Sequence, residues 1–141
     1  LVEIVDHTIA FYDAVEIKST KTLDRTMVFV DQDQIIRVLN NVLNNAIEAV
    51  HEDQEPEIAL SLELIEDSVL LTIKDNGRGI PTVLHDKIFE PNFTTKNSGM
   101  GLGLAMVKRI IDDVGGNIYF ESQQNKGTTF YISLPLLKQK G

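Results

Sequence analysis

The spacing of hydrophobic residues predicts three main helices. Apolar residues recur at helical intervals over 1–13, 31–50 and 102–114. The middle helix begins at Asp31, with Gln34 in capping-box position three residues later. Its apolar face consists of Ile35, Leu39, Val42, Leu43, Ala46 and Val50. Each of these helices has one side suited to packing against another layer.

Six short segments have the composition and bounding turns of strands. They cover residues 15–19, 26–30, 58–65, 69–73, 117–122 and 128–134. From 77 to 98 the periodicity is poor, apart from a short helix over 83–88. The order of elements predicts an α/β (α+β) two-layer sandwich, in which a mixed, mostly antiparallel sheet of about five strands carries the three helices on one face.

The composition of the chain excludes several classes of partner and binding site. The 141 residues carry a formal net charge of −8, which argues against a nucleic-acid or anionic-membrane surface as the main partner. There is no cysteine, so disulfides and thiolate metal sites are excluded. No apolar run approaches the length that crosses a membrane.

A glycine-rich entry to the third helix is the first candidate for chemistry. Residues 97–110 read "NSGMGLGLAMVKRI", and such entries cradle phosphates because backbone N–H groups and the helix dipole face the anion. The segment is not a P-loop, because no Lys-Ser or Lys-Thr follows a glycine. A Rossmann fingerprint fails as well, because "PNFTTKNS" upstream is not a strand.

Other motifs precede this loop. Asn41, Asn45 and Glu48 follow one another at helical spacing and share a polar stripe beside the apolar face of the 31–50 helix. The segment "LTIKDNGRGI" places Asp75 directly after a buried strand and before two glycines. "IFEPNFTTK" follows, and then the alternating glycines.

This ordered set resembles the ATP-binding domain of the GHKL superfamily, and most closely the catalytic domain of sensor histidine kinases. "NNVLNNAIEAV" is similar to the N box, "DNGRGI" to the first glycine box and "IFEPNFTTK" to the F box. "GMGLGLAMVKRI" resembles the second glycine box, and "GTTFYISLP" the last glycine motif. Each motif alone is weak evidence, whereas five in order are specific.

The resemblance implies ATP and Mg²⁺ as cofactors. It assigns Asn45 as the Mg²⁺ ligand, since Mg²⁺ prefers oxygen donors and shares them with phosphates. Asp75 would accept a hydrogen bond from the adenine amine. Gly77 and Gly79 would let the backbone approach the nucleotide, and Ile80 would line the adenine pocket.

The remaining implied nucleotide contacts surround a mobile ATP lid. Phe89 and Phe93 would anchor its ends, and Lys96 would be the nearest cation for the phosphates, beside Thr95. The second glycine box would offer its N–H groups to the phosphates. From this box and the last strands, the residues assigned to nucleotide binding are Gly99, Met100, Gly101, Leu102, Gly103, Leu104 and Thr128.

Asn41 and Glu48 are the candidate catalytic positions. ATP-hydrolysing members of the superfamily carry a glutamate where this chain has Asn41, and an amide is not a general base. Glu48 stands where many histidine kinases have a basic residue, and would orient a water on Mg²⁺ or accept a proton from a histidine. His7, His51 and His85 are interpreted as incidental, the last two in polar loops.

The implied function is transfer of the γ-phosphoryl group of ATP to a histidine on a separate dimerisation domain, in a two-component system whose response regulator is an indirect partner. Residues 1–13 would join that absent hairpin domain, 14–135 would form the catalytic domain, and 136–141 a polar tail. The fragment is expected to be monomeric and cytoplasmic. Its longer parent protein is compatible with attachment to a membrane. The alternatives are a GHKL-type ATPase or serine protein kinase, and a nucleotide-binding scaffold without transfer.

Overall fold

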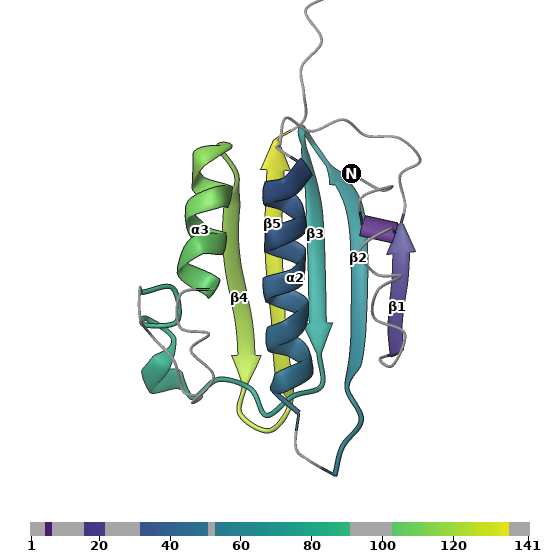
Figure 1. Cartoon of the computed structure of the whole chain (residues 1–141), viewed down its shortest axis with the longest axis vertical. Coiled ribbons are helices and arrows are strands. Elements are labelled where there is room, and N and C mark those ends of the chain that lie inside the picture. Colours follow the sequence, from purple (N-terminus) through teal and green to yellow (C-terminus); the bar gives the residue numbers. More distant parts are fainter. Residues whose placement is uncertain (1–4, 7–15, 22–31, 51–52, 91–102, 136–141) are drawn as a thin grey trace, which may run out of the picture.

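In the described part of the chain, a five-stranded sheet is covered on one face by the helices α2 and α3 (Figure 1). The computed structural model describes residues 5–6, 16–21, 32–50, 53–90 and 103–135. The elements are β1 (Glu16–Lys21), α2 (Gln32–Glu48), β2 (Glu57–Ile65), β3 (Ser68–Asp75), the 3₁₀ turn η1 (Thr82–Leu84), α3 (Gly103–Asp113), β4 (Asn117–Gln123) and β5 (Gly127–Pro135).

The sheet is mixed, with strand order β1-β2-β3-β5-β4. β1 runs parallel to β2, and every other pairing is antiparallel. The predicted mixed, mostly antiparallel sheet of about five strands is therefore confirmed. The predicted strand over 26–30 lies outside the described residues, as does the helix over 1–13 except at Val5 and Asp6, which are helical.

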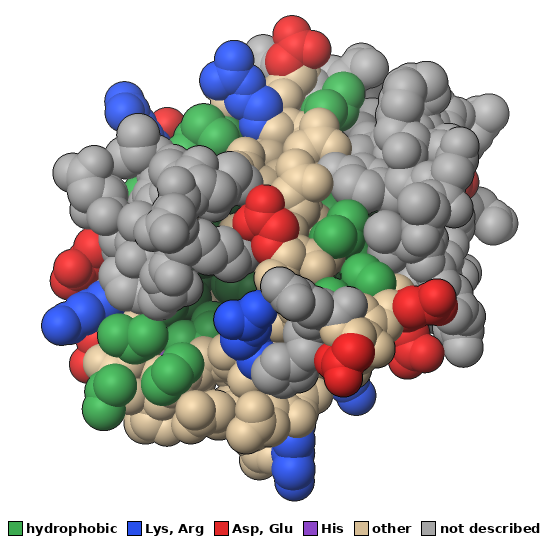
Figure 2. All heavy atoms as spheres, turned by 60° about the horizontal axis from the view of Figure 1, so that its bottom comes forward, with side chains coloured by type: hydrophobic (Ala, Val, Ile, Leu, Met, Phe, Trp, Pro, Cys, Tyr) green, Lys and Arg blue, Asp and Glu red, His purple; other side chains and the backbone are tan. Residues whose placement is uncertain are grey.

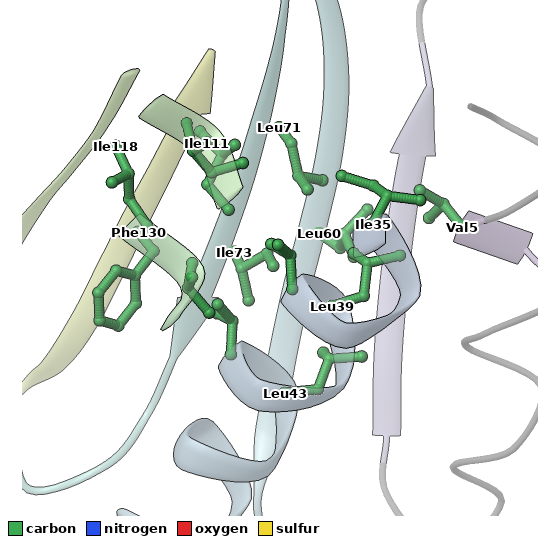
Figure 3. Close-up of a cluster of buried hydrophobic side chains, with 14 of the residues drawn as sticks. Val5, Ile35, Leu39, Leu43, Leu60, Leu71, Ile73, Ile111, Ile118 and Phe130 are labelled. Carbon is green, nitrogen blue, oxygen red and sulfur yellow. The ribbon is translucent and has the colours of Figure 1, made fainter. Parts of the chain in front are cut away.

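The core lies between the sheet and the two helices (Figure 3). Alternation along β3 and β5 turns every second side chain toward the helices. α2 meets them with Ile35, Leu39 and Leu43, and α3 with Val107 and Ile111, all at most 1% exposed. Burying each such side chain is worth about 1.5–3 kcal/mol. This packing fixes the two helices on the same face of the sheet.

The segment after β3 differs from the predicted short helix over 83–88. Only Thr82–Leu84 form a regular turn, of 3₁₀ type, entered from Pro81. Its backbone bonds span three residues, as from Leu84 N–H to the Pro81 carbonyl at 2.9 Å. Val83 is 82% exposed, and the later bonds from Lys87 to Leu84 and from Glu90 to Lys87 also span three residues.

The opposite face of the sheet carries two stacked tyrosines. The rings of Tyr119 and Tyr131 lie 4.8 Å apart at 14°, on neighbouring strands in direct register. Burial, then the carboxylate of Glu121, then Tyr119 raise the pKa of the Tyr131 phenol.

Candidate functional site

Several polar segments far apart in sequence meet at one end of the sheet. The carboxyl ends of α2 and β3, the turn between β4 and β5, and the segment containing η1 all lie at the lower end of Figure 1. Figure 2 turns this end forward, and there acidic and basic side chains lie close to a group of hydrophobic ones. The candidate site is built from these segments.

Asp75 is the buried acid of this site. It is 5% exposed, because it occupies the last helix-facing position of β3. Its Oδ1 accepts the backbone N–H of Gly77 at 2.8 Å and that of Thr128 at 3.2 Å. Two N–H donors on one oxygen fix the orientation of the Asp75 side chain.

The next residue, Asn76, anchors the loop that precedes β2. Its Oδ1 accepts the Glu57 N–H at 2.9 Å, and its Nδ2 donates to the Glu55 carbonyl at 3.1 Å. Gln54 Nε2 donates to the Asn76 carbonyl at 3.1 Å. Asn76 therefore holds a loop that is distant from it in the sequence.

Glycines allow three backbones to touch here. A Cβ on Gly77 would lie 2.6 Å from the Cβ of Ala49, at the end of α2. Gly79 has φ +73°, and a Cβ on it would lie 2.2 Å from the Gln123 carbonyl oxygen. Gly127 has φ +114°, and a Cβ on it would lie 2.1 Å from the Asp75 carbonyl oxygen. The described contacts that exclude a side chain at Gly77 and Gly79 are thus made by the protein itself.

Arg78 connects this glycine segment to α2. Its N–H donates to the Ala49 carbonyl at 2.8 Å, and its guanidinium reaches the carbonyls of Ala49 and Val50 at 3.3 and 3.5 Å. A cation suits this position because carbonyls at a helix carboxyl end carry partial negative charge. The Arg78 carbonyl accepts the Asn125 N–H at 2.6 Å. One residue therefore ties α2 to the β4–β5 turn.

A serine that the sequence interpretation missed links the same segments. Ser122 Oγ accepts the Ile80 N–H at 2.7 Å, donates to the Gly127 carbonyl at 3.1 Å and lies 2.8 Å from Thr128 Oγ1. Its signal in the sequence is the strand period: Ser122 continues the helix-facing row of Ile118 and Phe120 as a polar residue.

An aromatic cluster supports the segment after the glycines. The Phe120 ring contacts His85 edge-on at 4.9 Å, Phe89 at 6.0 Å and Phe130 at 5.8 Å. His85 Nε2 also bonds to the Ile80 carbonyl at 2.8 Å. The expected polar surroundings of His85 are wrong, because its ring packs on Phe120 and bonds to the backbone of Ile80.

The polar stripe of α2 borders this region. Asn41 and Asn45 are half-buried and Glu48 is exposed, so the three side chains follow one side of the helix as predicted. Asn41 Nδ2 donates to the Arg37 carbonyl at 2.8 Å. A Cβ on Gly103, the first residue of α3, would lie 2.6 Å from Asn41 Oδ1. Asn41 thus lies where the two helices meet.

The other predicted nucleotide contacts divide into two groups. Ile80, Phe89 and Leu104 pack against the hydrophobic core, and Thr128 is 6% exposed beside Asp75. The rest fall outside the described residues: Phe93, Thr95, Lys96, Gly99, Met100, Gly101 and Leu102. The predicted lid itself is in this second group, and its role stays a prediction.

Residues 30–138 match the model of the histidine kinase-, DNA gyrase B-, and HSP90-like ATPase family. That match covers well over half of the chain. The chain belongs to this family. The predicted membership of the GHKL superfamily is confirmed, and so is the α/β fold, which the family's catalytic domains share.

Within the family, the similar proteins are sensor kinases. Sporulation kinase A of Bacillus subtilis (strain 168) is 36% identical over 128 residues, covering 91% of this chain and 21% of its own length. The sensory histidine kinase/phosphatase NtrB of Rhizobium leguminosarum bv. phaseoli is 36% identical over 138 residues, covering 86% and 36%. The predicted resemblance to sensor histidine kinases is thereby confirmed.

The solved structures agree. The catalytic domain of histidine kinase ThkA superimposes with a TM-score of 0.84 at 32% identity, over 96% of this chain and 91% of that one. The family domain described here therefore corresponds to nearly all of an isolated kinase catalytic domain. It spans about a fifth to a third of the curated relatives it matches, 21% and 36% of their lengths.

Proposed function

We propose that this domain binds Mg·ATP and transfers the γ-phosphoryl group to a histidine of a separate dimerisation domain in its parent sensor kinase. The observation that carries the proposal is the buried carboxylate of Asp75, held by two backbone N–H groups beside Thr128. Family membership supplies the nucleotide class, and the sensor-kinase relatives supply the reaction class.

Adenine fits the Asp75 region by its chemistry. A carboxylate accepts hydrogen bonds and therefore suits the exocyclic amine of adenine, whereas the keto oxygen of guanine would face it without a donor. Ile80, held at both its N–H and its carbonyl, would supply an apolar wall. Gly77 and Gly79 would contribute backbone surface alongside.

Asn45 fits the role of Mg²⁺ ligand. Its amide oxygen is the kind of hard donor that Mg²⁺ takes, and it lies on α2 between the half-buried Asn41 and the exposed Glu48. In the described part of the chain no group of three or more histidines or acids gathers as a metal site. The proposal accordingly assigns the remaining ligands to phosphate oxygens and water. When bound, the ion would neutralise charge on the transferred phosphoryl group.

Transfer is favoured over hydrolysis by the side chain at position 41. Asn41 donates its amide to the Arg37 carbonyl and lies against Gly103, and an amide does not abstract a proton from water at neutral pH. Phosphoryl transfer to an imidazole depends mainly on positioning and charge stabilisation. Glu48 is exposed and is assigned to orienting a water on the metal or to accepting a proton from the histidine.

The partners and location follow from the same proposal. The domain would act on a histidine-bearing dimerisation domain of the parent chain, and a response regulator would receive the phosphoryl group in turn. We expect the domain itself to be monomeric and cytoplasmic. Among the described helices none has the length and hydrophobicity needed to cross a membrane.

Label from γ-³²P-ATP tests the proposal. With Mg²⁺ and the purified domain alone, filter binding should capture labelled ATP, and the label should stay on ATP for hours. Added to the dimerisation domain of its parent, the same preparation should produce an acid-labile, base-stable phosphohistidine. Failure to capture ATP, or capture without any transfer to that domain, would contradict the proposal.

The ATPase alternative predicts a different result in the same labelled-ATP assay. Steady release of labelled phosphate by the domain alone, abolished by Glu48→Gln, would identify Glu48 as the group that activates water. A control, Glu63→Gln, changes an exposed acid of β2 and should have no effect under either alternative. Release that persists in Glu48→Gln would point to a contaminating enzyme.

A further inference from the structure

Ser122 lies at the centre of the hydrogen bonds that surround Thr128. It pairs with Thr128 across β4 and β5, and both side chains lie on the helix-facing rows of their strands. Ser122 Oγ contacts three groups: the Ile80 N–H at 2.7 Å, the Gly127 carbonyl at 3.1 Å and Thr128 Oγ1 at 2.8 Å. No motif used above includes this serine.

Counting protons determines the direction of the Ser122–Thr128 bond. The serine hydroxyl has one proton and two lone pairs. The Gly127 carbonyl can only accept, so a bond to it uses the serine proton. Ser122 Oγ is then left to accept from both Ile80 N–H and the Thr128 hydroxyl. The reverse arrangement, with Ser122 donating to Thr128, leaves the Gly127 carbonyl without this donor and forms one hydrogen bond fewer.

We propose that Ser122 is a positioning residue of the nucleotide site, which holds the hydroxyl of Thr128 as a hydrogen-bond acceptor beside Asp75. The Thr128 proton points to Ser122, so its oxygen lone pairs are directed elsewhere. Thr128 is adjacent to Asp75, since its own N–H donates to the Asp75 carboxylate at 3.2 Å. Two acceptors therefore lie side by side at the end of β3 and the start of β5.

This pair of acceptors selects the ligand's donor. An amino group on a base, or a water bound to it, brings N–H or O–H protons to both oxygens. A keto oxygen at the same position brings lone pairs to both and is rejected. The inference rests on the proposed nucleotide-binding function and deepens it, because it adds Ser122 and the Thr128 proton to the basis of adenine selectivity.

The test is the ratio of affinities for ADP and IDP, which differ by an amine or a keto oxygen at the six position. Both are measured on the purified domain by displacement of a fluorescent ADP analogue. Ser122→Ala should weaken ADP about tenfold and IDP less than about threefold, so that the ratio falls. Loss of the Ile80 contact should weaken both nucleotides equally and leave the ratio unchanged. Ser122→Thr, which keeps a hydroxyl, should restore the ratio.

Thr128→Val provides the second arm, because it removes the hydroxyl through which Ser122 acts. It should lower the ADP/IDP ratio as Ser122→Ala does, and the double variant should lower it no further. A purely structural role of Ser122 would weaken both nucleotides alike, and that result overturns the inference. Should Ser122→Ala fail to fold, an unchanged ratio in Thr128→Val overturns it and a lowered one supports it. A wild-type domain that binds neither nucleotide refutes the proposed function itself.

Discussion

The two sides of the candidate site are built differently. On the base side, which is the side proposed to bind the adenine base, Asp75, Ser122 and Thr128 are joined to one another and to the backbone by bonds of 2.7–3.2 Å. On the side of α2, the helix presents half-buried Asn45 and exposed Glu48 to the surroundings. The side chains of the base side are held by hydrogen bonds within the protein. The polar residues of α2 lie together because they recur at the spacing of the helix.

The difference teaches where preorganisation lies. A buried acceptor must have its donors in the folded protein, because an unpaired buried polar group is costly. A side chain that keeps part of its surface in water, such as the half-buried Asn45, exchanges that water for a ligand at lower cost. We therefore expect changes on the base side that remove a buried hydrogen-bond partner or add a clash to affect folding as well as binding, and changes on α2 to affect binding alone.

Replacing Gly79 by Ala should break the base side most severely. The residue has φ +73°, and the added Cβ would lie 2.2 Å from the Gln123 carbonyl oxygen, so we expect a loss of about 3 kcal/mol or more in the free energy of unfolding. Urea denaturation followed by circular dichroism measures it. The control is Gly115→Ala, with φ +78° and nothing within 4 Å of its Cβ, which should lose about 1 kcal/mol. Equal losses would show that the contact is unimportant.

Asp75→Asn should separate binding from folding on the same side. The amide oxygen can still accept the N–H groups of Gly77 and Thr128, but an NH₂ replaces the second carboxylate oxygen. We expect ADP affinity to fall about 100-fold, or about 2.7 kcal/mol, while thermal stability changes far less. Calorimetric titration with ADP measures this. Asp67→Asn, in the exposed turn between β2 and β3, is the control, and an unchanged affinity in Asp75→Asn would remove Asp75 from the site.

Asn45→Ala sharpens the comparison on the α2 side. Loss of the proposed Mg²⁺ ligand should weaken ADP about tenfold in the presence of Mg²⁺. With the metal removed by EDTA the variant and wild type should bind ADP alike, and their unfolding free energies should agree. Asn44→Ala, an exposed neighbour on the same helix, controls for helix propensity. A loss that is independent of Mg²⁺ would show that Asn45 does not act through the metal.

Arg78→Ala tests the connection between the two sides and should have the smallest effect. It removes the guanidinium contacts to the Ala49 and Val50 carbonyls but keeps the backbone bond, so we expect a loss of about 0.5–1 kcal/mol in unfolding free energy. Denaturation at low ionic strength gives the largest signal. Arg109→Ala, on the exposed side of α3, is the matched charge control, and equal losses would mean that Arg78 does not stabilise α2.

The elements of the fold were predictable because each carries its own period. α2 has an apolar side that repeats with the helix, and β3 and β5 alternate with the strand. The predicted bounds agree with the described elements to within a few residues. The segment after Gly79 was less predictable, because its shape depends on contacts with Ser122 and Phe120 from a distant strand.

Residues of the candidate site could be predicted only where the residue type and its motif already indicate a binding role. Asp75 could be singled out because it follows a buried strand and opens the motif "DNGRGI", which resembles the first glycine box. Ser122 and His85 could not, because serine and histidine are common in loops and strands, and their partners are chosen by the packing of β4 against the glycine segment. The need for glycine at positions 77 and 79 likewise could not be read from the sequence, because it comes from close contacts with Ala49 and Gln123.

The bond between Asp75 and Thr128 has a consequence for how the domain folds. β2 with β3, and β4 with β5, are hairpins of neighbouring strands that can form locally, whereas β3 and β5 pair residues far apart in the chain. Asp75 ends the first hairpin, and Thr128 lies beside the turn of the second, at the start of β5, so the candidate site forms only when the two hairpins dock. A nucleotide at 100 times its dissociation constant would add about 2.7 kcal/mol to that docked state alone. The ligand would then stabilise the docking of the two hairpins and so contribute to the stability of the whole sheet.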